Sequence, residues 1–248
     1  ATPRSDRARI DKVRANMDRW RWLPRDLGQK YVIVNVPAYT IALVENGQVI
    51  ARHRAVVGQP KTATPQLNAT MTGVIFNPWW DLPNSIIKEV GPGAKGYITR
   101  KREDGSVSMR QKPGPGNALG RMKILMPNDY AIYLHDTPSK TLFKKDRRAF
   151  SHGCIRTQDA LGFAQTLLAP TGSWDKAQID QTIASGKTVK ADMAAPVPVY
   201  ITYFTAAAAK DKGGIIAYDD IYGRDDPVAV ALNDRPDTAL ASSPTGEN

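Results

Sequence analysis

Residues 31–58 read YVIVNVPAYTIALVENGQVIARHRAVVG, and this stretch decides the fold of the chain. Its first part, residues 31–36, is rich in aromatic and β-branched residues, which are typical of a strand. Residues 39–44 and 49–57 have the same character, and the Asn46-Gly47 pair between them is the favoured two-residue turn of a β-hairpin. Three strands in close succession predict a domain built mainly from β-sheet.

Further strands and two short helices are expected along the rest of the chain. The strands fall at residues 73–77, 122–126, 131–134 and 197–204, and the helices at residues 159–168 and 178–184, the first with Leu161, Ala164 and Leu168 on one face. His53, in the hairpin between two arginines, is expected to be an exposed strand residue with no chemical role. The fold class is therefore mostly β with flanking helices, an α+β domain.

The N-terminal segment predicts an amphipathic helix over residues 6–22. Ile10, Val13, Met17 and Trp20 recur at spacings of three and four, which puts them on one face and leaves the arginines outside. We expect residues 1–30 to form a helical segment that packs on the main domain, residues 31–205. Residues 206–248 form a C-terminal extension, and the part after about Asp225 lacks any period, which is typical of a flexible tail.

Residues 79–120 interrupt the main domain with a different composition. Pro83, Pro92, Pro113 and Pro115 accompany many glycines, and between residues 95 and 123 eight basic residues face two acidic ones. A stretch of this length without an apolar period is usually a functional lid or a disordered insertion.

Charge and hydropathy limit the classes of partner. The net charge is +10, but residues 219–248 carry seven acids and two bases, so the rest of the chain carries +15. Aromatic residues are not interleaved with the basic ones as in nucleic-acid-binding folds, so we expect no nucleic-acid partner. No apolar run approaches the ~20 residues of a membrane-spanning helix, and residues 1–22 do not resemble a signal region. An exported protein would therefore be present here in a trimmed form.

The candidate chemistry lies at the single cysteine, Cys154, in the stretch Ser-His-Gly-Cys-Ile-Arg at residues 151–156. A lone cysteine is often only a small buried hydrophobe. This one follows a polar, turn-like sequence, and Gly153 removes a side chain beside the sulfur. A thiol near an imidazole is the arrangement of a nucleophile with its base.

Two of the three histidines lie near this cysteine, and His135 is the better candidate for the base. It is expected at the end of a strand, nineteen residues before Cys154, which leaves enough chain to leave the sheet and return beside it. His152 is two positions from the cysteine on an irregular turn, so we expect it to shape the turn and contact substrate, although a part in proton transfer stays open. Asp136 follows His135 directly, and adjacent strand residues point apart, so its carboxylate is poorly placed to orient the imidazole.

These residues resemble the active-site signature of the L,D-transpeptidases, the YkuD-type enzymes that cross-link peptidoglycan. The resemblance covers about residues 7–205 and favours the larger Gram-negative branch of that family. Further stretches that carry it are residues 19–24 (RWRWLP), 34–39 (VNVPAY), 57–58 with 64–65, 77–80 (NPWW), 113–120 and 133–138 (YLHDTP). It implies a YkuD-type β-sandwich with the basic insertion as a lid over the active site, with Cys154 as nucleophile and His135 as base.

The surrounding residues receive expected roles. The backbone N–H groups of Gly153 and Cys154 are the candidate oxyanion donors. Ser151 is either a turn hydroxyl or an ancillary hydrogen-bond partner, and Arg156 is the natural clamp for a substrate carboxylate. Tyr133 and Trp80 line the substrate pocket or simply pack. In the resembled family the base is often oriented by a backbone carbonyl.

The resemblance also implies the reaction. Cys154 would attack diaminopimelate, the third residue of a tetrapeptide stem, release D-alanine and form a 3→3 cross-link with a second stem. Carbapenem-type β-lactams would acylate the same sulfur. We expect no metal and no organic cofactor, a monomer, and a periplasmic location.

Three alternatives stay open at this point. An L,D-carboxypeptidase or cell-wall amidase would use the same residues. A zinc hydrolase with His135, His152 and Cys154 as ligands is chemically feasible, although no carboxylate base accompanies it. A noncatalytic binder of anionic polymer would rely on the basic region alone.

Overall fold

A computed structural model describes residues 4–91, 93–209 and 213–234 of the chain. The chain divides into two compact units. We call Asp26–Thr202 the sheet unit, and Ala1–Arg25 together with Tyr203–Asn248 the terminal unit. The sequence predicted an N-terminal and a C-terminal segment as separate parts, whereas both belong to the terminal unit. That the N-terminal segment packs on the main domain stays a prediction.

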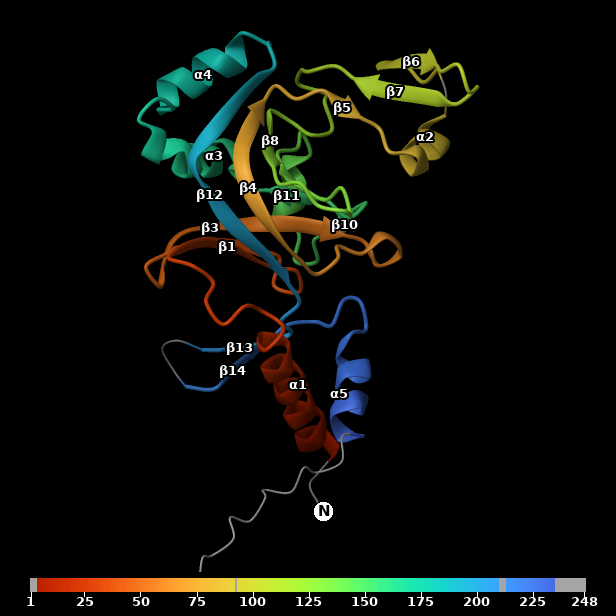
Figure 1. The fold of residues 1–248 in the computed structure, drawn as a ribbon. Coiled ribbons are helices and arrows are strands. Elements are labelled where there is room, and N and C mark those ends of the chain that lie inside the picture. Colours follow the sequence, from red (N-terminus) through yellow and green to blue (C-terminus); the bar gives the residue numbers. More distant parts are fainter. Residues whose placement is uncertain (1–3, 92, 210–212, 235–248) are drawn as a thin grey trace, which may run out of the picture. The chain divides into compact units, whose positions relative to one another are not determined.

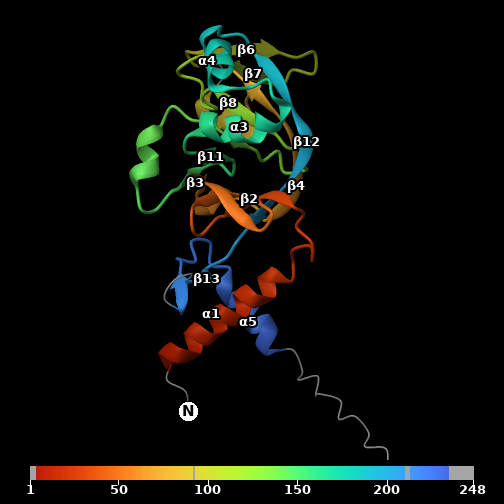
Figure 2. The ribbon, with the colours of Figure 1, turned by 90° about the vertical axis from the view of Figure 1, so that its left-hand side faces the viewer.

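The sheet unit is built on nine strands that are hydrogen-bonded in the order β10-β3-β11-β9-β8-β4-β12-β1-β2. Their bounds are β1 Lys30–Asn35, β2 Thr40–Glu45, β3 Gln48–Gly58, β4 Leu67–Phe76, β8 Met122–Leu125, β9 Leu134–His135, β10 Ala149–Ser151, β11 Ile155–Thr157 and β12 Val189–Thr202. β2, the last strand in this order, also pairs with β3. The strands from β3 to β2 therefore form a closed circuit of hydrogen-bonded neighbours. The long strands β4 and β12 run side by side in both views (Figures 1 and 2). The prediction of a mostly β fold with flanking helices is confirmed.

The hairpin expected from the sequence is present. Asn46 and Gly47 both have a positive φ, 50° and 75°, as the favoured two-residue hairpin turn requires. His53 is a correction, because it is half-buried rather than exposed. Its Nδ1 lies 2.9 Å from the carbonyl oxygen of Gln158, and its ring packs edge-on against Phe163. His53 is therefore a packing residue of β3.

Outside residues 79–120, two helices and three 3₁₀ turns accompany these strands in the described part of the sheet unit. They are α3 Ala160–Leu168, α4 Lys176–Ala184, η1 Pro60–Thr62, η2 Lys140–Lys144 and η3 Ala169–Thr171. Asp159 caps α3 by accepting from the N–H of Gly162. The helix packs against β12 and β8 and buries Phe163, Ala164 and Leu168, whereas Leu161, expected on the same face, is half-buried.

The described part of residues 79–120, which leaves out residue 92, forms regular secondary structure, and this corrects the alternative of a disordered insertion. It contains β5 Trp80–Asp81, α2 Asn84–Val90, β6 Tyr97–Lys101 and β7 Val107–Gln111, which we call the insert (Figure 1). The three strands form a sheet of their own in the order β5-β7-β6, over a small core of Leu82, Ile87 and Met109. Each element is short and contributes at most three apolar residues to this core, so the sequence shows no long apolar period.

The terminal unit consists of α1 Arg4–Trp20, β13 Ala206–Ala208, β14 Ile215–Ala217 and α5 Asp225–Asn233. α5 lies in the tail that was expected to be flexible, so that prediction is wrong up to Asn233; residues 235–248 lie outside the described residues.

The buried face of α1 also differs from the prediction. The apolar residues Ile10, Met17 and Trp20 are 50%, 60% and 52% exposed, and the buried side chains include Asn16 and Arg19. Arg19, expected outside with the other arginines, is only 2% exposed. α1 therefore turns a polar face inward.

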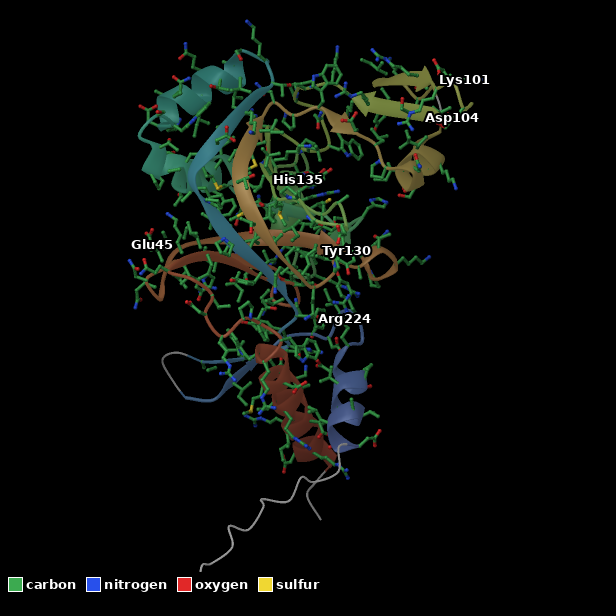
Figure 3. The ribbon with its side chains drawn as sticks, in the orientation of Figure 1. Glu45, Lys101, Asp104, Tyr130, His135 and Arg224 are labelled. Carbon is green, nitrogen blue, oxygen red and sulfur yellow. The ribbon has the colours of Figure 1, made fainter. Side chains whose placement is uncertain are left out.

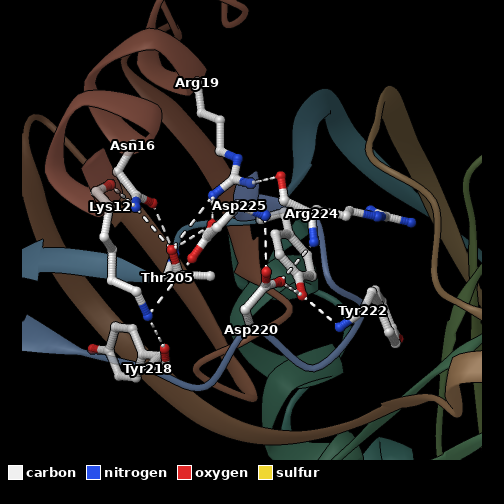
Figure 4. Close-up of polar contacts among 10 residues, drawn as sticks. Lys12, Asn16, Arg19, Thr205, Tyr218, Asp220, Tyr222, Arg224 and Asp225 are labelled. Carbon is white, nitrogen blue, oxygen red and sulfur yellow. Dashed lines mark hydrogen bonds and ion pairs between the residues drawn. The ribbon is translucent and has the colours of Figure 1, made fainter. Parts of the chain in front are cut away.

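This inward face is held by a polar network within the terminal unit (Figure 4). Arg19 Nη1 lies 2.6 Å from Asp225 Oδ1, and Arg19 Nη2 donates to the carbonyl oxygen of Arg224 at 2.7 Å. Asn16 donates to the hydroxyl of Thr205 at 2.8 Å and accepts from its backbone N–H at the same distance. Buried polar groups are tolerated when they are hydrogen-bonded. The contacts above provide such bonds across segments about 200 positions apart in the chain, although Arg19 Nε and Asp225 Oδ2 have no hydrogen-bond partner among the described residues.

Candidate active site

Cys154 lies in the turn that joins β10 to β11, and Ser151 closes this turn. The Ser151 hydroxyl donates to the carbonyl oxygen of Cys154 at 2.6 Å and accepts from the N–H of Gly153 at 3.2 Å. Thr64 donates to the carbonyl oxygen of Gly153 at 2.8 Å. Of the two roles considered for Ser151, these contacts favour the turn hydroxyl.

Gly153 is required by the geometry of the turn. Its φ is +113°, in the region that favours glycine, and an added Cβ would lie 3.0 Å from Cδ1 of Ile132. Its N–H points at Ser151 inside the turn. In this arrangement the Gly153 N–H is engaged by Ser151, so of the two predicted oxyanion donors the Cys154 N–H is the stronger candidate.

His135 lies inside the sheet unit, on β9 between β8 and β11 (Figure 3). The β9–β11 register pairs Leu134 with Ile155 and His135 with Arg156, so the turn carrying Cys154 stands beside the strand of His135. The imidazole Nδ1 donates to the carbonyl oxygen of Asp136 in a short hydrogen bond. This is a backbone carbonyl in the orienting position, and it leaves Nε2 as the basic nitrogen.

The carboxylate of Asp136 is engaged elsewhere, as its position in the strand predicted. It accepts from the N–H of Arg121 at 2.8 Å and pairs with Lys140. The close approach of this carboxylate to Gly120 leaves no room for a Cβ there, since Oδ2 would lie 2.4 Å from it. The Asp136 carboxylate therefore supports the strand end, and only the backbone carbonyl of this residue orients the base.

Burial keeps the nucleophile and its base neutral. Burial, reinforced by the charge of Arg156, lowers the pKa of His135 to about 4. Burial also raises the pKa of the Cys154 thiol, against hydrogen bonds from Tyr133 and the charges of Lys123 and Arg156. A neutral imidazole is ready to accept the thiol proton, so the proton moves when the sulfur attacks.

Tyr133 and Trp80 both reach the sulfur's surroundings. The Tyr133 phenol and the Cys154 thiol are hydrogen-bonding partners, and Trp80 hydrogen-bonds to the same phenol. Burial and the neighbouring sulfur raise the pKa of Tyr133. The Tyr133 ring also packs edge-on against His135, with 5.7 Å between ring centroids. A residue of the insert thus contacts the site through Tyr133.

His152 points away from the sulfur and toward the insert. Its side chain is 41% exposed, and Nε2 lies 3.0 Å from Oε2 of Glu89 in α2. This geometry favours His152 as a contact between the turn and the insert over a role in proton transfer.

Two cations flank His135. Arg156 on β11 is half-buried, and its Nε is buried without a hydrogen-bond partner among the described residues. Lys123 on β8 is the register partner of His135 on the other side. Sequence reasoning missed Lys123, although alternation offered a signal: Met122, Ile124 and Met126 are buried, so Lys123 faces the other side of the strand.

The zinc alternative requires a cluster of side chains that could ligate the metal. Within the described part of the chain, no three or more His, Cys, Asp or Glu side chains form a group that could hold a metal ion, which leaves the zinc alternative without a ligand set. None of the described helices combines the length and apolar character needed to cross a membrane.

Comparison with known proteins assigns the family. The family profile of YkuD, the L,D-transpeptidase catalytic domain, matches residues 29–201. A Haemophilus influenzae protein named "Putative L,D-transpeptidase" is 32% identical over 246 residues, which cover 89% of this chain and 49% of that protein. The chain belongs to the L,D-transpeptidase catalytic domain family. It spans about half the length of this curated relative.

Solved structures of the same family are also similar. An L,D-transpeptidase from Mycobacterium smegmatis has 16% identity and a TM-score of 0.36, over 70% of this chain and 58% of that one. L,D-transpeptidase 3 from Mycobacterium tuberculosis, in complex with a faropenem-derived adduct, has 12% identity and a TM-score of 0.37, over 70% of this chain and 60% of that one.

Proposed function

We propose that this protein is a cysteine-dependent L,D-transpeptidase that acts on tetrapeptide stems of peptidoglycan. The observation that carries the proposal is the neutral His135, which is fixed through Nδ1 to the Asp136 carbonyl on the strand beside Cys154. This is the arrangement that a thiol needs to become a nucleophile at the moment of attack.

The reaction proceeds in two steps. The Cys154 sulfur bonds to the carbonyl carbon of diaminopimelate in the third position, and His135 accepts the thiol proton. The bond to D-alanine breaks, and its nitrogen takes the proton from His135. The side-chain amine of a second diaminopimelate then attacks the thioester, an amide forms, and the sulfur regains a proton. The product is a 3→3 cross-link.

Charge and hydrogen bonding support these steps. The Cys154 N–H is the candidate donor to the developing oxyanion. Arg156, whose Nε lacks a partner among the described side chains, is the candidate clamp for a stem carboxylate. The insert touches the site through Trp80 and Glu89, which supports a role as a lid.

The same proposal extends to inhibitors and location. Carbapenem-type β-lactams would acylate Cys154, since they present a strained carbonyl to the same sulfur. The reaction needs no metal and no organic cofactor, and its substrate places the protein in the periplasm.

The test is incubation with purified disaccharide-tetrapeptide followed by mass spectrometry. We expect a dimer that lacks one D-alanine, and a C154A variant should give none. Loss of D-alanine without dimer would mean an L,D-carboxypeptidase. No change in mass, with salt-sensitive binding that survives in C154A, would mean a noncatalytic binder.

A further inference from the structure

Lys123, His135 and Arg156 form one row across three neighbouring strands. Lys123 is the register partner of His135 on β8, and Arg156 is its register partner on β11. Register partners on adjacent strands project from the same face of a sheet. The base is therefore flanked by one cation on each side.

Lys123 has no acidic partner of its own. Its Nζ lies 5.3 Å from the centroid of the Tyr133 ring, and its charge acts on the Cys154 sulfur. Among the described residues, no carboxylate lies within ion-pair distance of Lys123, and the side chain is half-buried. A partly desolvated ammonium without a counter-charge is available to an anionic ligand.

A cavity of about 200 Å³ adjoins this ammonium. It is lined by Lys123, Met126, Asn128, Ala131, Ile132 and Tyr133, with Ile124, Leu125 and Pro127. Lys123 is the single charged residue of this lining. The cavity lies next to the nucleophile, because Sγ of Cys154 is 3.8 Å from the carbonyl oxygen of Ala131 in its wall.

The cavity wall is held in place by Asn128. Its Nδ2 donates to the carbonyl oxygens of Met126 and Ile132, both at 2.7 Å, and its Oδ1 accepts from the N–H groups of Tyr130 and Ile132. Ala131 has a φ of 52°, an unfavourable value for a residue with a Cβ. The Asn128 amide is thus engaged by the loop, and the Tyr133 phenol is engaged by Cys154 and Trp80, which leaves the Lys123 ammonium for a ligand.

We propose that this cavity receives the leaving D-alanine and that Lys123 binds its terminal carboxylate. The inference rests on the proposed transpeptidase function. A small, mainly apolar cavity with one cation suits a residue with a methyl side chain and one negative charge. Arg156, on the other side of His135, is then left for a carboxylate elsewhere on the stem. Lys123 would select stems that end in a free D-alanine.

The experiment combines a change in the enzyme, Lys123→Gln, with a change in the substrate, amidation of its C-terminal carboxylate. Wild-type protein and Lys123→Gln are given disaccharide-tetrapeptide with either a free or an amidated C-terminus, and release of D-alanine or D-alaninamide is followed by mass spectrometry. A hydrogen bond between charged groups contributes about 10- to 100-fold in kcat/KM. We expect wild type to prefer the free acid by that factor, mainly through KM. Lys123→Gln should lose the preference, because its kcat/KM should fall more with the free acid than with the amide by about the same factor. Lys123→Arg should retain part of the preference.

The controls separate this inference from the function on which it rests. Lys144→Gln, an exposed lysine of the same unit, should behave as wild type with both substrates. Two results would overturn the inference. In the first, Lys123→Gln keeps the full preference for the free acid. In the second, Lys123→Gln loses the same factor in kcat/KM with both substrates, which would mean that Lys123 acts on the sulfur and not on the carboxylate. If wild type releases D-alanine from neither substrate, the proposed function itself has failed.

Discussion

The two units treat a buried arginine in opposite ways. In the terminal unit Arg19 is 2% exposed and pairs with Asp225 at 2.6 Å, inside a network that also engages Thr205. In the sheet unit Arg156 and Lys123 are both half-buried on either side of His135, and neither has an ion pair among the described residues. Removing a charge from water is costly unless a partner compensates it. We therefore expect the first charge to matter for folding, and we propose that the other two bind negative charges of the substrate.

The largest effect is expected when the nucleophile is removed, because the sheet unit is proposed to carry the chemistry and the terminal unit is not. We expect C154A to abolish D-alanine release and β-lactam acylation while the thermal unfolding temperature changes little. The turn is held by Ser151 and Thr64, not by the sulfur, so its loss should not disturb the unit. Residual turnover above a few per cent in the variant would remove Cys154 from the mechanism.

The two histidines should differ strongly in effect. His135→Ala removes the general base and should lower the rate of acylation by a carbapenem by about 10²–10⁴. His152→Ala should be milder, because its Nε2 contacts Glu89 in the insert and not the sulfur. Pre-steady-state acylation by both variants measures this, and the reverse order would transfer the base to His152.

The paired charge should matter for folding and not for chemistry. Asp225→Ala leaves Arg19 buried without its counter-charge, which should cost about 3–5 kcal/mol in the free energy of unfolding of the terminal unit. The double variant R19M/D225L, which replaces the pair by apolar residues, should recover most of that loss. Denaturant unfolding followed by tryptophan fluorescence is the measurement, in a background where Trp79, Trp80 and Trp174 are replaced by phenylalanine so that the signal comes from Trp20 and Trp22 of the terminal unit. If the double variant is no more stable than Asp225→Ala, the hydrogen bonds of Arg19 and Asp225 also contribute to the free energy of unfolding, beyond compensating the buried charge.

The buried base predicts a pH dependence of stability. The pKa of His135 is lowered from 6.5 to about 4, so the unfolded chain binds more protons than the folded one between these values. The free energy of unfolding should therefore fall as the pH drops from about 6.5 to 4, by up to about 3 kcal/mol. Comparing wild type with His135→Gln across this range isolates the effect, because the variant lacks this titration. Identical slopes would show that His135 is not held neutral by burial.

The sequence predicted those elements of the fold that neighbouring residues determine, such as turns and amphipathic helices. The hairpin followed from Asn46-Gly47, and the helix at α3 from its spacing of apolar residues. The same reasoning chose the wrong face of α1. Its inward face includes Asn16 and Arg19, because the residues they meet, Thr205 and Asp225, come from the far end of the chain. A helical period cannot reveal such a partner.

The chemistry of the site was largely present in the sequence, and its geometry was not. The motif around Cys154 and the spacing to His135 named the reacting groups, because nucleophile and base must be particular residue types. That Nδ1 of His135 meets a backbone carbonyl, and that Lys123 stands in register with it, depended on the pairing of β8, β9 and β11. Register between strands is fixed by hydrogen bonds and burial across distant segments, so only the tertiary structure decided which charges surround the base and which remain unpaired.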